Sequence, residues 1–174
     1  MLDPRKESSF LQTEKMLKSK KVLGIKIHPD YHGYDVMDHA DKIFSFANDV
    51  SAAILMHPQH IDKIARMAGD YPQMKLIIAH LGGAEWVDAV KGSRHKNVFT
   101  DTSGMASFKN NIIEYAVLKA GSEQILFGTD TYSCAFQRGR IDYADISESD
   151  KENILYKNAL RLFGKKTDIF GFKF

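Results

Sequence analysis

Histidine and aspartate side chains follow three short apolar segments of the chain, at the point where each segment ends. His57 comes after residues 52–56, His80 after 75–79, and Asp130 after a Phe-Gly-Thr run. Imidazole and carboxylate groups are the donors that zinc and similar divalent ions bind. In parallel α/β proteins, ligands bind at the carboxyl ends of the strands. The pattern therefore predicts one site that contains His57, His80 and Asp130.

Two more side chains lie at the end of the first apolar segment, within residues 24–29 (Gly-Ile-Lys-Ile-His-Pro). We expect Lys26 and His28 to contact the substrate or to support the metal ligands. The fourth segment leads to residues 101–104 (Asp-Thr-Ser-Gly), for which the sequence indicates no role of its own. His32 and His60 are expected to be surface residues.

The elements that must position these side chains alternate between short apolar segments and amphipathic helices. Near-continuous apolarity favours strands that are covered on both faces, and hence a parallel sheet. The predicted strands are 22–27, 52–56, 75–79, 97–100 and 125–129. Their spacing of roughly 25 residues is consistent with βα units. We therefore expect an α/β fold, a partial TIM-type (β/α)8 barrel of about five parallel βα units, over residues 1–164, followed by a C-terminal tail at 165–174.

Helices are predicted wherever apolar residues recur at a spacing of 3.6. One helix, at about 7–20, precedes the first strand. Further apolar stripes lie within 36–47, 61–68 and 112–120, the last followed by Gly121 as a stop. The final helix is expected to start with Ser149 and Glu152 as a capping box and to end at Gly164.

Composition excludes several classes of partner. The formal net charge is +2, with lysines interleaved among acids, so we expect no nucleic acid and no membrane partner. The single cysteine, Cys134, allows no intrachain disulfide, which fits a reducing compartment. The first 21 residues lack an apolar signal-peptide core, and no run approaches the ~20 apolar residues of a membrane helix. A cytoplasmic location is expected.

Four motifs together resemble the amidohydrolase-related family known as amidohydrolase 2, which includes metal-dependent decarboxylases. They are residues 24–29, 80–83 (His-Leu-Gly-Gly), 101–104 and 127–130, and the closing helix at 154–163 also fits. The resemblance covers about 22–164, and the motifs occur in the family's order.

The resemblance implies a role for each residue. His57 would bind the metal from strand five. His80 would bind a second metal or polarise the substrate, and Asp130 would touch the metal and carry the proton. Lys26 and His28 would match strand four. The implied cofactor is a divalent metal, with zinc expected first. Metal-activated water would cleave an amide, ester or lactone of a small-molecule substrate, or the same site would decarboxylate an acid.

One departure from the family matters. The family opens with His-x-His on strand one, and no two histidines here are separated by one residue. We therefore expect a C-terminal fragment or split half covering about strands 4 to 8, which binds zinc weakly and is inactive when isolated. The alternatives are an inactive half-barrel remnant or partner subunit, and an open α/β domain that binds an anion or nucleotide. No Gly-x-Gly-x-x-Gly motif supports the last.

Such a half-barrel should leave apolar surface open to water. Alternation back from His57, His80 and Asp130 predicts an exposed inward face, and both sheet edges should lack a partner. The residues with that alternation are Ala53, Leu55, Leu76, Ile78 and Leu126. We therefore expect a homo-oligomer, or a partner chain that supplies the missing strands.

Overall fold

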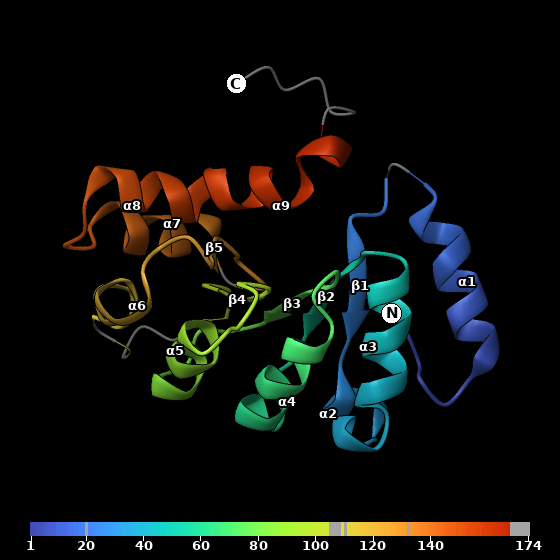
Figure 1. The fold of residues 1–174 in the computed structure, drawn as a ribbon. Helices are drawn as coiled ribbons and strands as arrows, with labels where there is room; N and C mark the ends of the chain where they lie inside the picture. The colour runs from blue at the N-terminus through green and yellow to red at the C-terminus, as the bar shows by residue number, and fades with distance from the viewer. Residues whose placement is uncertain (20, 105–108, 110, 132, 168–174) are drawn as a thin grey trace.

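A five-stranded parallel sheet lies at the centre of the molecule (Figure 1). The computed structural model describes residues 1–19, 21–104, 109, 111–131 and 133–167. The strands pair in chain order and are β1 (Gly24–Ile27), β2 (Ala53–Met56), β3 (Lys75–Ile78), β4 (Val98–Asp101) and β5 (Ile125–Leu126). This confirms the predicted α/β class and its five parallel strands. The fifth strand is shorter than predicted.

Helices connect the strands and enclose the sheet. The α-helices are α1 (Glu7–Leu17), α2 (Pro29–His32), α3 (Ala40–Asp49), α4 (Ile61–Met67), α5 (Ala84–Lys91), α6 (Ile112–Ala120), α7 (Cys134–Asp142), α8 (Glu148–Glu152) and α9 (Asn158–Thr167). Short 3-10 turns form η1 (Val36–Asp38) and η2 (Ala68–Asp70), and a π-helical turn forms η3 (Asn153–Lys157). The apolar stripes predicted α3, α4 and α6, whereas no stripe had singled out α5 or α7. No described helix is long and apolar enough to cross a membrane.

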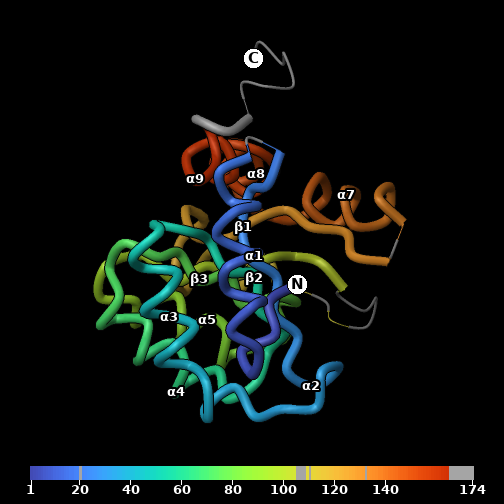
Figure 2. Tube along the Cα trace, turned by 90° about the vertical axis from the view of Figure 1, so that its right-hand side faces the viewer, coloured from blue at the N-terminus to red at the C-terminus, as the bar shows by residue number. Residues whose placement is uncertain are grey.

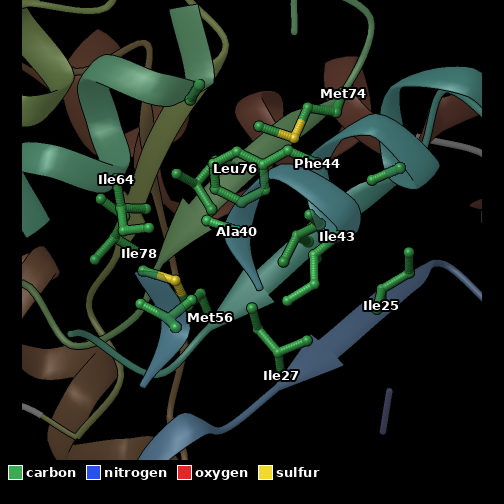
Figure 3. Packing of buried hydrophobic residues seen from close by; sticks show 14 of the residues in the cluster. Ile25, Ile27, Ala40, Ile43, Phe44, Met56, Ile64, Met74, Leu76 and Ile78 are labelled. Carbon is green, nitrogen blue, oxygen red and sulfur yellow. The ribbon is translucent and has the colours of Figure 1, made fainter. Parts of the chain in front are cut away.

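The largest apolar core lies between one face of the sheet and helices α3 and α4 (Figure 3). Strand side chains enter it from alternate positions, and helix side chains close it from the other side. Its members include Ile25, Ile27, Met56, Leu76, Ile78, Ile43, Phe44 and Ile64. Burying each large apolar side chain contributes roughly 1.5–3 kcal/mol, so this layer holds the strands in place.

Helix α9 covers part of the opposite face of the sheet (Figures 1 and 2). Its Leu162 and Phe163 pack against Ala53, Ile77 and Leu126, which are only 5–7% exposed. The expectation of an exposed inward face is therefore wrong for Ala53 and Leu126.

The expected alternation in β3 is also wrong, because Leu76 and Ile78 belong to the core under α3 and α4. His80 has a left-handed backbone, with φ at 65°, so the alternation of β3 does not extend to it. Ile77 takes the inward position instead.

Both edges of the sheet receive hydrogen bonds from the chain itself. At β1, the Leu2 amide donates to the Lys26 carbonyl at 3.0 Å. Beside β5, the Phe127 amide donates to the Ile154 carbonyl at 2.9 Å. The buried Asn158 amide group donates to the carbonyls of Ser122 and Ile125 at 2.7 and 2.6 Å. The edges are thus partly satisfied, which corrects the expectation that both lack a partner.

The C-terminal helices begin and end at residues other than those predicted. Ser147, not Ser149, caps α8, since its hydroxyl accepts a hydrogen bond from the Asp150 amide at 3.1 Å. Helix α9 continues through Gly164 to Thr167. A glycine inside a helix costs about 1 kcal/mol relative to alanine, which packing can offset. Of the predicted tail, residues 168–174 lie outside the described part of the chain.

Candidate active site

Three imidazole rings meet beyond the carboxyl ends of β1, β2 and β3. The rings of His28 and His57 are stacked, with centroids 3.9 Å apart, and His57 meets the edge of His80 at 5.1 Å. Parallel pairing in register brings the ends of neighbouring strands to the same edge, so each histidine arrives beside the next. The structure thus brings together His57, His80 and His28.

The environment of two of these rings favours their uncharged form. Burial lowers the pKa of His57 from 6.5, and the nearby His28 and His80 lower it further. Burial, followed by the charge of Lys26, lowers the pKa of His28 as well. Asp30, in the first turn of α2, places a carboxylate oxygen 3.6 Å from His57 Nε2. An uncharged imidazole has one free lone pair, which a metal or proton can use.

Lys26 of β1 lines a cavity of about 260 Å³ on the inward face of the sheet. Most of the cavity wall is apolar, with Leu55, Ile77 and Leu126 among its residues, and Asp101 adds a carboxylate. Burial lowers the pKa of Lys26, while the charges of Asp101 and Asp130 act in the opposite direction. A cation in an apolar cavity is suited to an anionic group on an apolar ligand.

A buried hydrogen-bond network holds His80 against the segment that follows β4. One oxygen of Asp101 accepts from the backbone amides of His80 and Ser103, at 3.0 and 2.9 Å, and from the Ser103 hydroxyl at 2.5 Å. His80 Nδ1 in turn lies 3.1 Å from the Ser103 carbonyl oxygen and 3.0 Å from its hydroxyl. Asp101 therefore fixes both the backbone and the ring of His80.

Two glycines leave space for this network. A Cβ atom at Gly104 would lie 2.7 Å from His80 Nδ1, and one at Gly128 would lie 2.9 Å from the Ser103 Cβ. Both distances are too short for real atoms. The motif at 101–104, whose role the sequence did not indicate, thus supports His80. Its position directly after a strand was the only signal.

Asp130 is exposed and has a left-handed backbone, with φ at 53°. Among the described residues it is linked to the cluster through its charge effect on Lys26. Its predicted contact with a metal stays a prediction.

The metal-ligating side chains of this cluster do not form a complete metal site in the structure. Across the described part of the chain, no three histidine, cysteine, aspartate or glutamate side chains form a group able to hold a metal ion. His57 and His80 are adjacent donors, and further donors would be needed to complete a set of three or four.

The sequence matches the family described as amidohydrolase over residues 1–165. The chain belongs to the amidohydrolase family. This match confirms the family resemblance that we inferred from the motifs at the strand ends. Among curated proteins, no sequence matches this chain.

Solved structures with the same fold include two decarboxylases. A dihydroxybenzoic acid decarboxylase from Polaromonas, with manganese and 2-nitroresorcinol bound, has a TM-score of 0.68 at 18% identity and matches over 93% of this chain and 66% of its own. A 5-carboxyvanillate decarboxylase from Novosphingobium aromaticivorans, also with manganese bound, has a TM-score of 0.71 at 16% identity. That match covers 94% of this chain and 63% of the decarboxylase.

A third match is a protein from Staphylococcus aureus described as a putative amidohydrolase. Its TM-score is 0.67 at 18% identity, and the match covers 91% of this chain and 70% of that one. The chain thus spans about two thirds of the length of the solved chains that it matches. At these identities the likeness shows the fold alone, that of part of a barrel. The metal in the two decarboxylases is manganese, and neither supports the expectation of zinc.

Proposed function

We propose that this chain forms part of a metal-dependent enzyme that decarboxylates small aromatic acids. One observation carries the proposal: Lys26 lines a mostly apolar cavity, and its charge lowers the pKa of both His28 and His57. Apolar walls suit an aromatic ring, and the ammonium group suits its carboxylate. The manganese-containing relatives act on dihydroxybenzoate and carboxyvanillate, which are ligands of this kind.

The proposed reaction breaks the bond between the ring carbon and the carboxyl carbon. The bonding electrons stay on the ring, carbon dioxide leaves, and a proton takes its place on the ring carbon. We assign delivery of that proton to Asp130, which is exposed to solvent. Lys26 holds the acid, and His28 contacts its polar substituents.

The proposed cofactor is a divalent ion, with manganese in place of the zinc expected from sequence. His57, His80 and Asp130 remain the proposed ligands within this chain. Because the described residues do not form a three-donor group, we expect only weak metal binding by these 174 residues. The ion would supply charge stabilisation to the reacting acid.

Hydrolysis of an amide, ester or lactone is the second candidate. The family's description as amidohydrolase favours it, as does the likeness to the amidohydrolase from Staphylococcus aureus. An inactive remnant or partner subunit is the third.

Binding of 2,6-dihydroxybenzoate, followed by NMR with and without Mn²⁺, tests the proposal. We expect the acid to shift the signals of the His28 and His57 rings, and Lys26→Met to weaken binding about 10- to 100-fold, the value of one charged hydrogen bond of roughly 1.5–3 kcal/mol. Lys75→Met, at the opposite end of the strands, is the matched control. Binding unchanged by Lys26→Met would contradict the proposal.

Turnover is measured on the protein as encoded, including any segment that precedes residue 1. Carbon dioxide release with Mn²⁺, without cleavage of an aryl ester, is the expected result. Ester cleavage without carbon dioxide release would favour hydrolysis, and neither reaction would favour the inactive alternative.

A further inference from the structure

The hydrogen bonds of His28 and His80 differ in one respect that decides what each ring can do. A neutral imidazole carries one proton, so one ring nitrogen donates and the other accepts. The hydrogen-bond partner of one ring nitrogen therefore shows which of the two nitrogens carries the proton. Both rings use Nδ1 for a bond within the chain, but the partners are of opposite kinds.

At His80, Nδ1 lies 3.1 Å from the backbone carbonyl oxygen of Ser103. A carbonyl oxygen only accepts, so Nδ1 must donate and must carry the proton. The Ser103 hydroxyl donates its own proton to Asp101, at 2.5 Å, which leaves its oxygen free to accept from Nδ1 as well. In the neutral ring, Nε2 on the other side is therefore the unprotonated nitrogen.

At His28, Nδ1 accepts a hydrogen bond of 3.2 Å from the backbone amide of Tyr31. A backbone amide only donates, so this nitrogen must be the unprotonated one. The proton of neutral His28 is therefore on Nε2. The same bond caps the start of α2, and Asn in this position could replace the cap but not the Nε2 proton.

We propose that the backbone locks these two histidines in opposite tautomers, with Asp101 and Ser103 as the positioning residues of His80. His80 Nε2 then presents a lone pair, to accept a proton or bind a metal, and never donates in its neutral form. His28 Nε2 presents an N–H group, which suits an anionic oxygen of the substrate and excludes metal binding by neutral His28. These roles, though not the tautomers, rest on the function proposed above.

The assignment favours one of the two roles that the family resemblance implied for His80. His80 was expected either to bind a second metal or, if uncharged, to polarise a substrate oxygen by donating to it. With Nδ1–H turned to Ser103, a neutral His80 has no proton for a substrate oxygen, and the donor role passes to His28. The stacking of His28 on His57, at 3.9 Å, keeps this donor within the cluster.

NMR of the ring nitrogens in histidine-labelled protein, at about pH 8 where free imidazole is neutral, tests the tautomers directly. We expect the two rings to give opposite patterns in one spectrum: Nδ1 protonated in His80, and Nε2 protonated in His28. Finding the same tautomer in both, or Nε2 protonated in His80, would overturn the proposal.

Asp101→Ala should reduce the Nδ1-protonated population of His80, because it frees the backbone amides of His80 and Ser103. Ser103→Ala keeps the carbonyl acceptor and loses only the hydroxyl contact, so its effect should be smaller. The matched control is Ser122→Ala, which breaks a similar serine–aspartate bond of 2.6 Å, to Asp150, away from the site. It should leave the His80 signals unchanged. A His80 pattern that is identical in Ser103→Ala, Asp101→Ala and the wild type would show that the network does not set the tautomer. Where Asp101→Ala fails to fold, the wild-type spectrum and Ser103→Ala decide.

The donor role of His28 is tested separately with 2,6-dihydroxybenzoate. His28→Asn keeps a side chain that can cap α2, so it should fold like the wild type yet bind the acid about 10-fold more weakly or worse. Wild-type affinity in His28→Asn would overturn the donor role. If the acid does not bind even the wild-type protein, the proposed function is wrong. The tautomer assignment is then still tested by the NMR spectrum, which does not depend on substrate binding.

Discussion

At the scale of single residues, the site depends on which side chains the strand ends bring into contact. The sequence placed His57 and His80 at strand ends, and their rings are neighbours. It could not show that Asp30 faces His57 or that Asp101 and Ser103 hold His80, because these contacts depend on how loops fold back. The metal roles of His57, His80 and Asp130 stay predictions.

The lowered pKa values of His28 and His57 predict a dependence of stability on pH. In the unfolded chain both rings titrate near 6.5, whereas burial keeps them unprotonated to lower pH in the folded state. The unfolded state therefore takes up protons first, and stability present at about pH 7 should be lost as pH falls towards about 5. Thermal melts of the variant with His28→Gln and His57→Gln should show a flatter profile. Replacing the exposed His95 should leave the dependence of melting temperature on pH as it is in the wild type. A double variant whose melting temperature depends on pH as steeply as that of the wild type would contradict the prediction.

At the scale of elements, apolar runs and helical stripes predicted the strands and three of the connecting helices. The stripes missed α5 and α7. The capping-box pattern placed the cap of the last helices at Ser149, with Glu152 as its partner. The structure instead uses Ser147, whose hydroxyl accepts from the Asp150 amide, and the sequence fits either serine equally well. Competing local hydrogen bonds of this kind are decided by tertiary packing.

The bonds from Asn158 to β5 should contribute measurably to stability. Asn158→Ala would leave the buried carbonyls of Ser122 and Ile125 without this donor, which should cost about 1–3 kcal/mol. Chemical denaturation measures the loss. Lys157→Ala, which removes only a surface ion pair with Glu152 on the same stretch of helix, should change stability by about 0.5 kcal/mol or less. Equal effects of the two changes would show that Asn158 has no special role.

At the scale of the whole molecule, the sequence predicted the partial barrel but not how the chain covers it. The open face was expected to drive association with a copy or a partner chain. Helix α9 instead places Leu162 and Phe163 over that face. Sequence alone could not predict this, because an amphipathic helix gives no information about which face of the sheet it covers. Whether the protein is a homo-oligomer stays a prediction.

Removing this cover should expose the inward face. Phe163→Asp puts a charge against Ala53, Ile77 and Leu126, so we expect α9 to detach and the fraction of dimers and larger species to rise at micromolar concentration. Sedimentation velocity provides the measurement. Leu118→Asp, at a leucine that is already 79% exposed, should not increase association. A Phe163→Asp protein that sediments like the wild type would contradict the role given to α9.

The claim that the strand-end cluster is a divalent metal site is tested most directly by paramagnetic broadening with Mn²⁺. We predict that substoichiometric Mn²⁺ broadens the ring signals of His57 and His80 before those of the exposed His95, and that His57→Ala abolishes this preference. Broadening spread evenly over all histidines, or unchanged in His57→Ala, would contradict a metal site at the carboxyl ends of these strands.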